Sequence, residues 1–339
     1  MELLIYLILF LLVLIVSSTT NKLLPFLPLP LVQILLGIVI GLFLPNTDFH
    51  LNTELFLALV IGPLLFREAE EADVTAILKH WRIIVYLIFP VIFISTLSLG
   101  GLAHLLWFSL PLAACLAVGA ALGPTDLVAF ASLSERFSFP KRVSNILKGE
   151  GLLNDASGLV AFQVALTAWT TGAFSLGQAS SSLIFSILGG FLIGFLTAMT
   201  NRFLHTFLLS VRATDIASEL LLELSLPLVT FFLAEEVHVS GIIAVVVAGI
   251  LKASRFKKIT LLEAQVDTVT ETVWHTVTFM LNGSVFVILG MELEMIAEPI
   301  LTNPIYNPLL LLLSLIALTF VLFVIRFIMI YGYYAYRTR

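Results

Sequence analysis

Long apolar runs alternate with short polar or charged segments along the whole chain. A membrane-spanning helix needs about 20 mostly apolar residues. Stretches of that kind are centred near residues 11, 37, 60, 94, 120, 160, 190, 226, 245, 282 and 320. The third and ninth are short and tightly bounded by charge. The pattern predicts an all-α polytopic membrane protein with about 11 transmembrane helices.

The amino-acid composition also indicates a membrane protein. Of 339 residues, 60% are hydrophobic and only 12% are charged, and the mean hydropathy is +1.09, which excludes a water-soluble domain with an ordinary polar surface. Glu2 rather than a basic stretch precedes the first apolar run, so we interpret that run as a retained helix and not as a signal peptide. No basic patch interleaved with aromatic residues indicates nucleic acid, and the single Cys115 excludes an intrachain disulfide.

The Lys and Arg residues predict an orientation. With the amino terminus outside, almost all of them, Lys252 included, fall in loops on one side, and the opposite loops carry acids instead. Because cytoplasmic loops carry the Lys/Arg excess, we expect a multi-pass cell-membrane protein with its carboxy-terminal end in the cytoplasm. Arg67, at a helix end, can extend to the headgroups, whereas Arg326 lies deep in an apolar run and needs an acidic partner.

The apolar run around residue 120 is interrupted by Gly-Pro-Thr-Asp at residues 123–126. Pro124 removes a backbone donor and clashes with the carbonyl four residues earlier, so we predict a broken helix there. Broken helices at membrane depth recur at ion sites, where the Thr125 carbonyl and the Asp126 carboxylate can bind a hard cation. A structural kink in which Asp126 caps the second half-helix fits these residues equally well.

The next apolar run contains Glu150, Asn154 and Asp155. Glu150 and Asn154 are four residues apart and share a helix face, whereas Asp155 is rotated by about 100° from Asn154. A carboxylate in hydrocarbon needs a partner or a function, so we assign Glu150 to Arg326 as a structural ion pair and leave Asp155 to bind an exchangeable cation or proton. The alternatives are a cytoplasmic helix end for Glu150 and a surface position for Asp155.

The run around residue 60 ends in an acidic cluster, Glu68, Glu70 and Glu71. Such a cluster is usually a solvated helix end, and only Glu68, nearest the apolar run, is a candidate cavity residue. The histidines, including His205 in a predicted loop, have no Cys or carboxylate at ligand spacing, so no zinc site is indicated.

These motifs resemble those of the bacterial sodium/proton antiporters of the NhaP type, relatives of the eukaryotic sodium/hydrogen exchangers. The resemblance spans the whole chain in the family's order. Its specific part is the Asn-Asp pair with a preceding Glu, at residues 149–155, at a fixed distance from the Thr-Asp of residues 123–126. Weaker parts are the glycine-rich residues 240–249, residues 274–291 and Arg326.

The resemblance implies an inverted-repeat, homodimeric secondary antiporter, not an enzyme and without a cofactor, that exchanges sodium for protons, with lithium or potassium as alternative cations. It implies a sodium site made by Asp155, Asp126, Thr125 and Glu68 with Asn154 beside them, and a structural pair between Glu150 and Arg326. In the family, Asn at position 154 goes with electroneutral exchange. We expect a single membrane domain, residues 1–339, with 80–171 and 301–339 as the ion-binding core bundle and 1–79 and 172–300 as the scaffold and dimer-interface panel.

Two departures from the family pattern stand out. Family members commonly have Ser where this chain has Gly151, so a water replaces that hydroxyl or the ion preference differs. The family also continues for two more helices, one of them the counterpart of the broken helix. We therefore expect either that residues 1–339 are a piece of a longer chain or that the second broken helix is absent, and no normal antiport cycle from these residues alone.

The mechanism we expect is competition between cation and proton for the Asp155 carboxylate. Burial and polar neighbours act in opposite senses on its pKa and can bring it near cytoplasmic pH. The occupied site is then neutral, whereas the bare carboxylate is held back by its desolvation cost. The alternatives are a cation channel or sensor on the same scaffold and, less favoured, an intramembrane aspartyl protease, whose Tyr-Asp and Gly-x-Gly-Asp strings are both absent.

Overall fold

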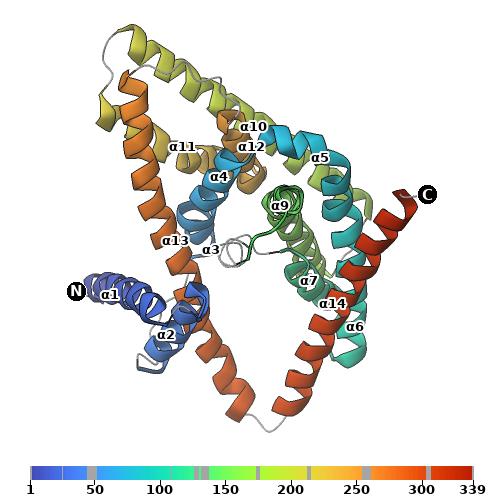
Figure 1. Ribbon diagram of the computed structural model, residues 1–339. Helices are drawn as coiled ribbons and strands as arrows, with labels where there is room; N and C mark the ends of the chain where they lie inside the picture. Colours follow the sequence, from blue (N-terminus) through green and yellow to red (C-terminus); the bar gives the residue numbers. More distant parts are fainter. Residues whose placement is uncertain are drawn as a thin grey trace. The chain divides into compact units, whose positions relative to one another are not determined.

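The computed structural model describes residues 2–24, 26–43, 52–107, 109–125, 130, 137–172, 176–211, 215–253, 261–302 and 307–337. Within these ranges every regular element is a helix and no strand occurs (Figure 1). The elements are α1 (Glu2–Leu23), α2 (Leu29–Phe43), α3 (Thr53–Phe56), η1 (Leu57–Ile61), α4 (Gly62–Glu71), α5 (Val74–Tyr86), η2 (Leu87–Val91), α6 (Ile92–Leu106), α7 (Leu112–Leu122), α9 (Lys141–Thr171), α10 (Leu176–Ser210), α11 (Ile216–Glu236), α12 (Gly241–Ala253), α13 (Leu261–Thr302) and α14 (Pro308–Arg337).

The predicted all-helical class is confirmed. Each predicted apolar centre falls in one of these helices or in a continuous run of them. Among the described residues, five runs are long and apolar enough to cross a membrane, and four apolar helices are shorter. The five are Val74–Leu106, Phe185–Ser210, Ile216–Glu236, Gln265–Leu293 and Pro308–Tyr336. The number of about 11 spans therefore remains a prediction.

Two helical runs contain a single π-helical turn next to a proline. Pro90 lies inside η2, and Pro63 is the second residue of α4, directly after η1. A proline ring displaces the carbonyl four residues earlier, and a wider π turn makes room for it without ending the helix. The runs from Thr53 to Glu71 and from Val74 to Leu106 consequently stay continuous.

The chain divides into two compact units, and each is described by itself. Unit 1 comprises residues 1–71, 128–137 and 188–303, and unit 2 comprises residues 72–127, 138–187 and 304–339. Unit 1 therefore holds α1 to α4, most of α10, and α11 to α13, while unit 2 holds α5 to α7, α9, the start of α10, and α14.

In unit 1, α2 packs closely on α13 (Figure 1). Gly37 and Gly290 face each other across this contact, and a Cβ at Gly290 would overlap the Ile34 carbonyl oxygen and lie 2.9 Å from the Gly37 Cα. Helices in a membrane associate by van der Waals contact, which small residues strengthen by letting the backbones approach. The α2–α13 contact therefore depends on the absence of a side chain at both positions.

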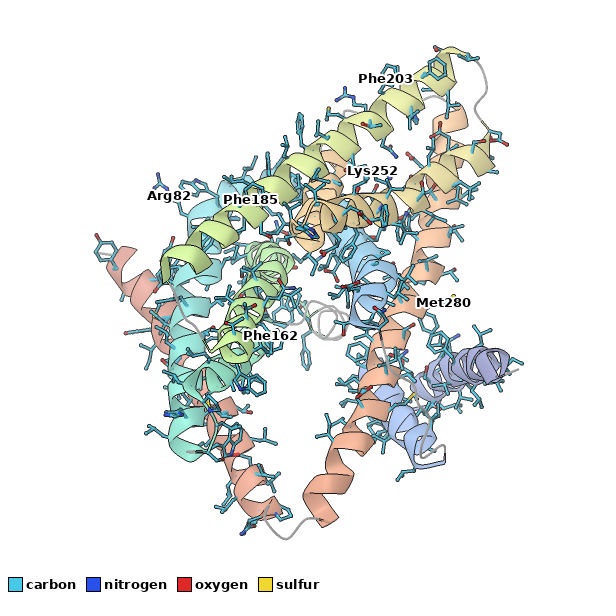
Figure 2. All side chains as sticks on the ribbon, turned by 180° about the vertical axis from the view of Figure 1, so that it is seen from behind. Arg82, Phe162, Phe185, Phe203, Lys252 and Met280 are labelled. Carbon is cyan, nitrogen blue, oxygen red and sulfur yellow. The ribbon has the colours of Figure 1, made fainter. Side chains whose placement is uncertain are left out.

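A largely buried group of charges joins three helices of unit 1, α4, α11 and α12; we define this buried charge cluster as Arg67, Glu70, Glu71, Glu223 and Lys252. The Lys252 Nζ, on α12, lies 3.2 Å from Glu70 Oε1 on α4 and 2.7 Å from Glu223 Oε1 on α11 (Figure 2 labels Lys252). Arg67 Nη1 lies 3.0 Å from Glu70 Oε2, and Arg67 Nε lies 2.7 Å from Glu71 Oε1. On α13, the indole of Trp274 donates to Glu223 at 3.2 Å.

The charge cluster corrects three sequence expectations, and a separate pair on α10 and α11 corrects a fourth. Glu70 is not a solvated helix end, because its side chain is only 15% exposed and pairs with Lys252. Arg67 is paired with two carboxylates rather than extended to the headgroups. Lys252 lies in the last turn of α12, not in a loop, and is 9% exposed. His205 lies on α10, with its Nε2 3.4 Å from Glu219 Oε2 on α11. Glu70, Lys252 and His205 pair with residues on other helices, whereas Arg67 pairs with carboxylates of its own helix.

In unit 2, α6 is the central helix. It packs on α7 and on α14, and Leu99, Ala103, Cys115 and Leu318 form a shared core. The preceding α5 packs on α9 through Ile83, Ile84 and Ile146. Asp73 caps the start of α5 by accepting from the Thr75 hydroxyl and the Ala76 N–H, and these hydrogen bonds lower the pKa of that carboxyl.

We predict that Gly290→Ala destabilises the protein and that Gly101→Ala does not. Both glycines are in helices, but a Cβ at Gly101 meets nothing within 4 Å. Overpacking a close helix contact costs about 1–3 kcal/mol, whereas Ala at an open helical position is favourable by about 0.5–1 kcal/mol. Unfolding in detergent micelles measures both variants; equal stability of the two would contradict the close α2–α13 contact.

Glu70→Gln and Glu71→Gln test the charge cluster with the same substitution at neighbouring positions. Glu70→Gln should lower the free energy of unfolding by about 2 kcal/mol, because a buried charged hydrogen bond is lost. Glu71 is 61% exposed, and its pair with Arg67 should contribute less than about 1 kcal/mol. Unfolding in detergent micelles measures both variants. A loss of unfolding free energy for Glu71→Gln as large as for Glu70→Gln would contradict the buried position of Glu70 in the cluster.

Candidate functional site

The predicted break near Pro124 is where α7 ends. The helix stops at Leu122, and Gly123 and Pro124 follow as a bend. Helix α9 packs directly on this bend at Gly158. A Cβ at Gly158 would overlap the Pro124 ring, so the close contact requires a glycine there. The end of α7 thus lies against the middle of α9, inside unit 2.

Asn154 is fully buried at this contact and connects the two segments. Its Nδ2 donates to the Thr125 hydroxyl oxygen at 2.8 Å and to Glu150 Oε1 at 3.1 Å. The second bond confirms that Glu150 and Asn154 share a face of one helix. With both amide hydrogens used, the side chain of Asn154 has a fixed orientation, and its Oδ1 has no hydrogen-bond partner among the described residues.

Arg326 approaches the same place from α14. Its Nη1 lies 3.4 Å from Glu150 Oε1, and its Nη2 donates to the Gly123 carbonyl at 2.5 Å. Glu150 is 2% exposed, which excludes the alternative of a solvated helix end. The Gly123 carbonyl follows the last turn of α7, where carbonyls lack helical partners and the helix dipole is negative. One guanidinium therefore neutralises a buried carboxylate and a helix end together.

We call Thr125, Glu150, Asn154 and Arg326, with the Gly123 carbonyl, the buried polar network. Its formal charges cancel, since Arg326 carries the positive charge and Glu150 the negative one. It still has two unused polar atoms among the described residues, Asn154 Oδ1 and Arg326 Nε. Buried polar atoms rarely remain without a partner, so an acceptor and a donor are available here to water or to a substrate ion.

The structure describes the other predicted site residues to different extents. Asp126 lies outside the described residues. Asp155 follows Asn154 in α9, but the structure describes its backbone only. Glu68 lies in α4 of unit 1 and is engaged by a partner within the structure. Gly151 is buried in α9, one residue after Glu150. Among the residues searched, no three His, Cys, Asp or Glu side chains form a metal site.

Two features of this site were not predicted from the sequence. The contact of Gly158 with Pro124 had no signal beyond a glycine in an apolar helix. The bond from Arg326 to the Gly123 carbonyl joins residues 203 positions apart. The sequence predicts that the buried guanidinium of Arg326 needs partners. It does not predict that one of these partners is a backbone carbonyl.

Comparison with known proteins identifies a protein family that this chain matches. The family model described as "Sodium/hydrogen exchanger, transmembrane" matches residues 7–337. The chain is 36% identical over 329 residues to the "Sodium, potassium, lithium and rubidium/H(+) antiporter" of Bacillus pumilus, covering 97% of this chain and 49% of the relative. It is 36% identical over 313 residues to the protein of the same name in Bacillus subtilis, covering 92% of this chain and 47% of the relative.

A solved structure has the same fold. The sodium proton antiporter MjNhaP1 from Methanocaldococcus jannaschii aligns with a TM-score of 0.66 at 21% identity, over 86% of this chain and 70% of that one. The predicted antiporter fold is thereby supported for the described helices. The chain spans about half the length of the curated relatives that it matches.

Thr125→Val and Thr125→Ser test the bond that joins the break to α9. Valine has the same shape as threonine but no hydroxyl, so the Asn154 amide loses an acceptor and the free energy of unfolding should fall by about 1 kcal/mol. Serine keeps the acceptor and should lose less. Unfolding in detergent micelles compares the two; a valine variant at least as stable as the serine variant would show that the bond contributes nothing.

Proposed function

The chain belongs to the sodium/hydrogen exchanger family, and from that premise we propose that it exchanges a monovalent cation for protons across a membrane. The observation that carries the proposal is the unused Oδ1 of the fully buried Asn154, one residue before Asp155 and bonded to the segment where α7 breaks. Alkali cations prefer oxygen ligands. An amide oxygen, a hydroxyl and a carboxylate near a helix break supply them.

Competition at Asp155 is the proposed mechanism. One carboxylate can hold a cation or a proton but not both, so binding of one displaces the other. Glu150 does not compete, because its charge is neutralised by Arg326 at 3.4 Å. Asp155 then decides the charge of the site, which is neutral when occupied and negative when empty. An empty site would retain its charge at membrane depth, at a cost of several kcal/mol, and this cost couples the two fluxes.

The polar network would hold the site in place during exchange. Arg326 and Asn154 connect α14, α9 and the end of α7 into one body. We propose that Thr125 and Asp126 complete the cation site, and the role of Glu68 in it stays a prediction. The network contains Asn rather than a second ionisable acid at position 154, which supports electroneutral exchange of one cation for one proton.

Sodium is the substrate that we propose first. The relatives' names include potassium, lithium and rubidium, and Gly151 offers no hydroxyl to a small cation. A looser site would accept larger alkali ions, so lithium and potassium are further candidates.

Unit 2, which holds the polar network, is in this proposal the ion-binding core, and unit 1 is the scaffold and the homodimer interface. The close contacts of α2 with α13 and the buried charge cluster support a rigid role for unit 1. We further propose a cell-membrane location with the amino terminus outside, on the Lys and Arg distribution.

Asp155→Asn tests the exchange, with Asp73→Asn as the matched control. Asp73 is exposed, and Asn is an equally good helix cap, so this control should transport normally. In everted vesicles from cells expressing the native gene, sodium should collapse an acid-interior pH gradient for wild type and for the control, and not for Asp155→Asn. The apparent sodium affinity of wild type should fall about tenfold per pH unit below the pKa of the site.

Sodium-driven proton flux from a folded Asp155→Asn variant would refute competition at this residue. A cation channel would instead give single-channel currents and a flux that no proton gradient drives. Both variants are checked by gel filtration for correct folding.

A further inference from the structure

One apolar stripe follows the outer face of unit 2 from α5 through η2 to α6. Leu78, Trp81, Val85, Phe89 and Phe93 are all exposed, between 40% and 65%, and their spacing of three or four residues places them on one helix face. The run from Val74 to Leu106 is long and apolar enough to cross a membrane. The stripe therefore faces lipid chains.

Two cations lie at the beginning of this stripe. Lys79 and Arg82 are exposed, and neither has an ion-pair partner within the part of the chain that the structure describes. Arg82 lies 5.7 Å from the ring centroid of Trp81 (Figure 2 labels Arg82, on the outer side of its helix). The acid that precedes them, Asp73, is bonded to the helix start by Thr75 and Ala76. The two cations outnumber this one carboxylate, so the face keeps a net positive charge.

The start of α9 adds to the same charge. Gly149 packs on Ile77 and Ile84 of α5, with a Cβ there 2.8 Å from Ile84 Cδ1 and 3.2 Å from Ile77 Cγ1. Lys148, next to Gly149, is exposed and without an ion-pair partner among the described residues. Lys148 thus lies near the first turns of α5, where Lys79 and Arg82 are.

The last turns of α14 supply aromatic rings and hydroxyls beside these cations. Tyr86, one turn after Arg82, donates to the Met329 carbonyl at 3.2 Å, and its ring lies 4.9 Å from that of Tyr333. Tyr331 and Tyr336 of the same helix end are exposed at 68% and 86%. Tyr, Trp, Lys and Arg at the end of a spanning helix are typical of the headgroup level of a membrane.

We propose that the surface formed by Lys79, Trp81, Arg82 and the tyrosine end of α14 binds the headgroup of an anionic phospholipid. Lys79 and Arg82 bind the phosphate, Trp81 lies at the level of the glycerol backbone, and the acyl chains follow the apolar stripe. Because the stripe begins directly at the cations, the ligand needs a phosphate and a long apolar part in one molecule. A free phosphate would leave the stripe uncovered.

The test is lipid retention by the purified full chain in a neutral detergent, measured by native mass spectrometry during titration with phosphatidylglycerol or with phosphatidylcholine of the same chains. Wild type should retain phosphatidylglycerol in preference to phosphatidylcholine. A juxtamembrane cation strengthens binding of an anionic lipid about fivefold, so the double variant Lys79→Gln/Arg82→Gln should bind phosphatidylglycerol about 25-fold more weakly at low salt. Its binding of phosphatidylcholine should not change.

Two further variants separate this site from bulk charge and from misfolding. Lys22→Gln/Arg202→Gln removes two exposed cations from unit 1 and should bind like wild type. Lys79→Arg/Arg82→Lys retains both charges and should also bind like wild type. Unchanged binding by Lys79→Gln/Arg82→Gln, an equal loss in the unit 1 variant, or displacement of the lipid by inorganic phosphate would overturn the proposal. The readout is lipid binding alone, so it is independent of the outcome for Asp155 and exchange.

Discussion

Arg326 imposes the constraint on which the organisation of unit 2 depends. A guanidinium stays charged wherever it is buried, and in an apolar bundle it must be surrounded by groups that stabilise that charge. Glu150 supplies one, and the carbonyl exposed by the break at Gly123 supplies another. The carbonyl freed by the break thus stabilises the arginine, and Asn154 joins the break to α9 through Thr125 and Glu150. Removing Arg326 or Glu150 alone would leave the other charge buried and unpaired, at a cost of about 3–5 kcal/mol.

Much of this arrangement follows from local rules that act on the sequence. Apolar runs of spanning length predicted the helices, and Pro124 predicted the end of α7. The spacing of four between Glu150 and Asn154 predicted their shared face. Pro63 and Pro90 show the limit of this rule, because a proline can end a helix or be accommodated by a π turn, as it is at η1 and η2. The roles of Asp126 and Asp155 in cation binding stay predictions.

The buried charge cluster could not be predicted in the same way. Glu70 on α4 lies far in the sequence from Glu223 on α11 and Lys252 on α12, and no spacing in the sequence pairs these three residues. Only the packing of α4, α11 and α12 shows that they share one interior. Counting charges by loop likewise missed that Lys252 is retained inside the bundle. Charge patterns report which side of a membrane a segment favours, whereas pairing between distant residues decides how deeply a charge lies.

The core that Cys115 shares with Leu99, Ala103 and Leu318 has a practical consequence. The single thiol of residues 1–339 is fully buried, so thiol-reactive dyes and spin labels would find no accessible target on these residues in the folded protein. A cysteine introduced at one exposed position on each unit would then carry the only labels. Distances between the units, and their changes when cation or pH is varied, become measurable by spectroscopy without first removing a native residue.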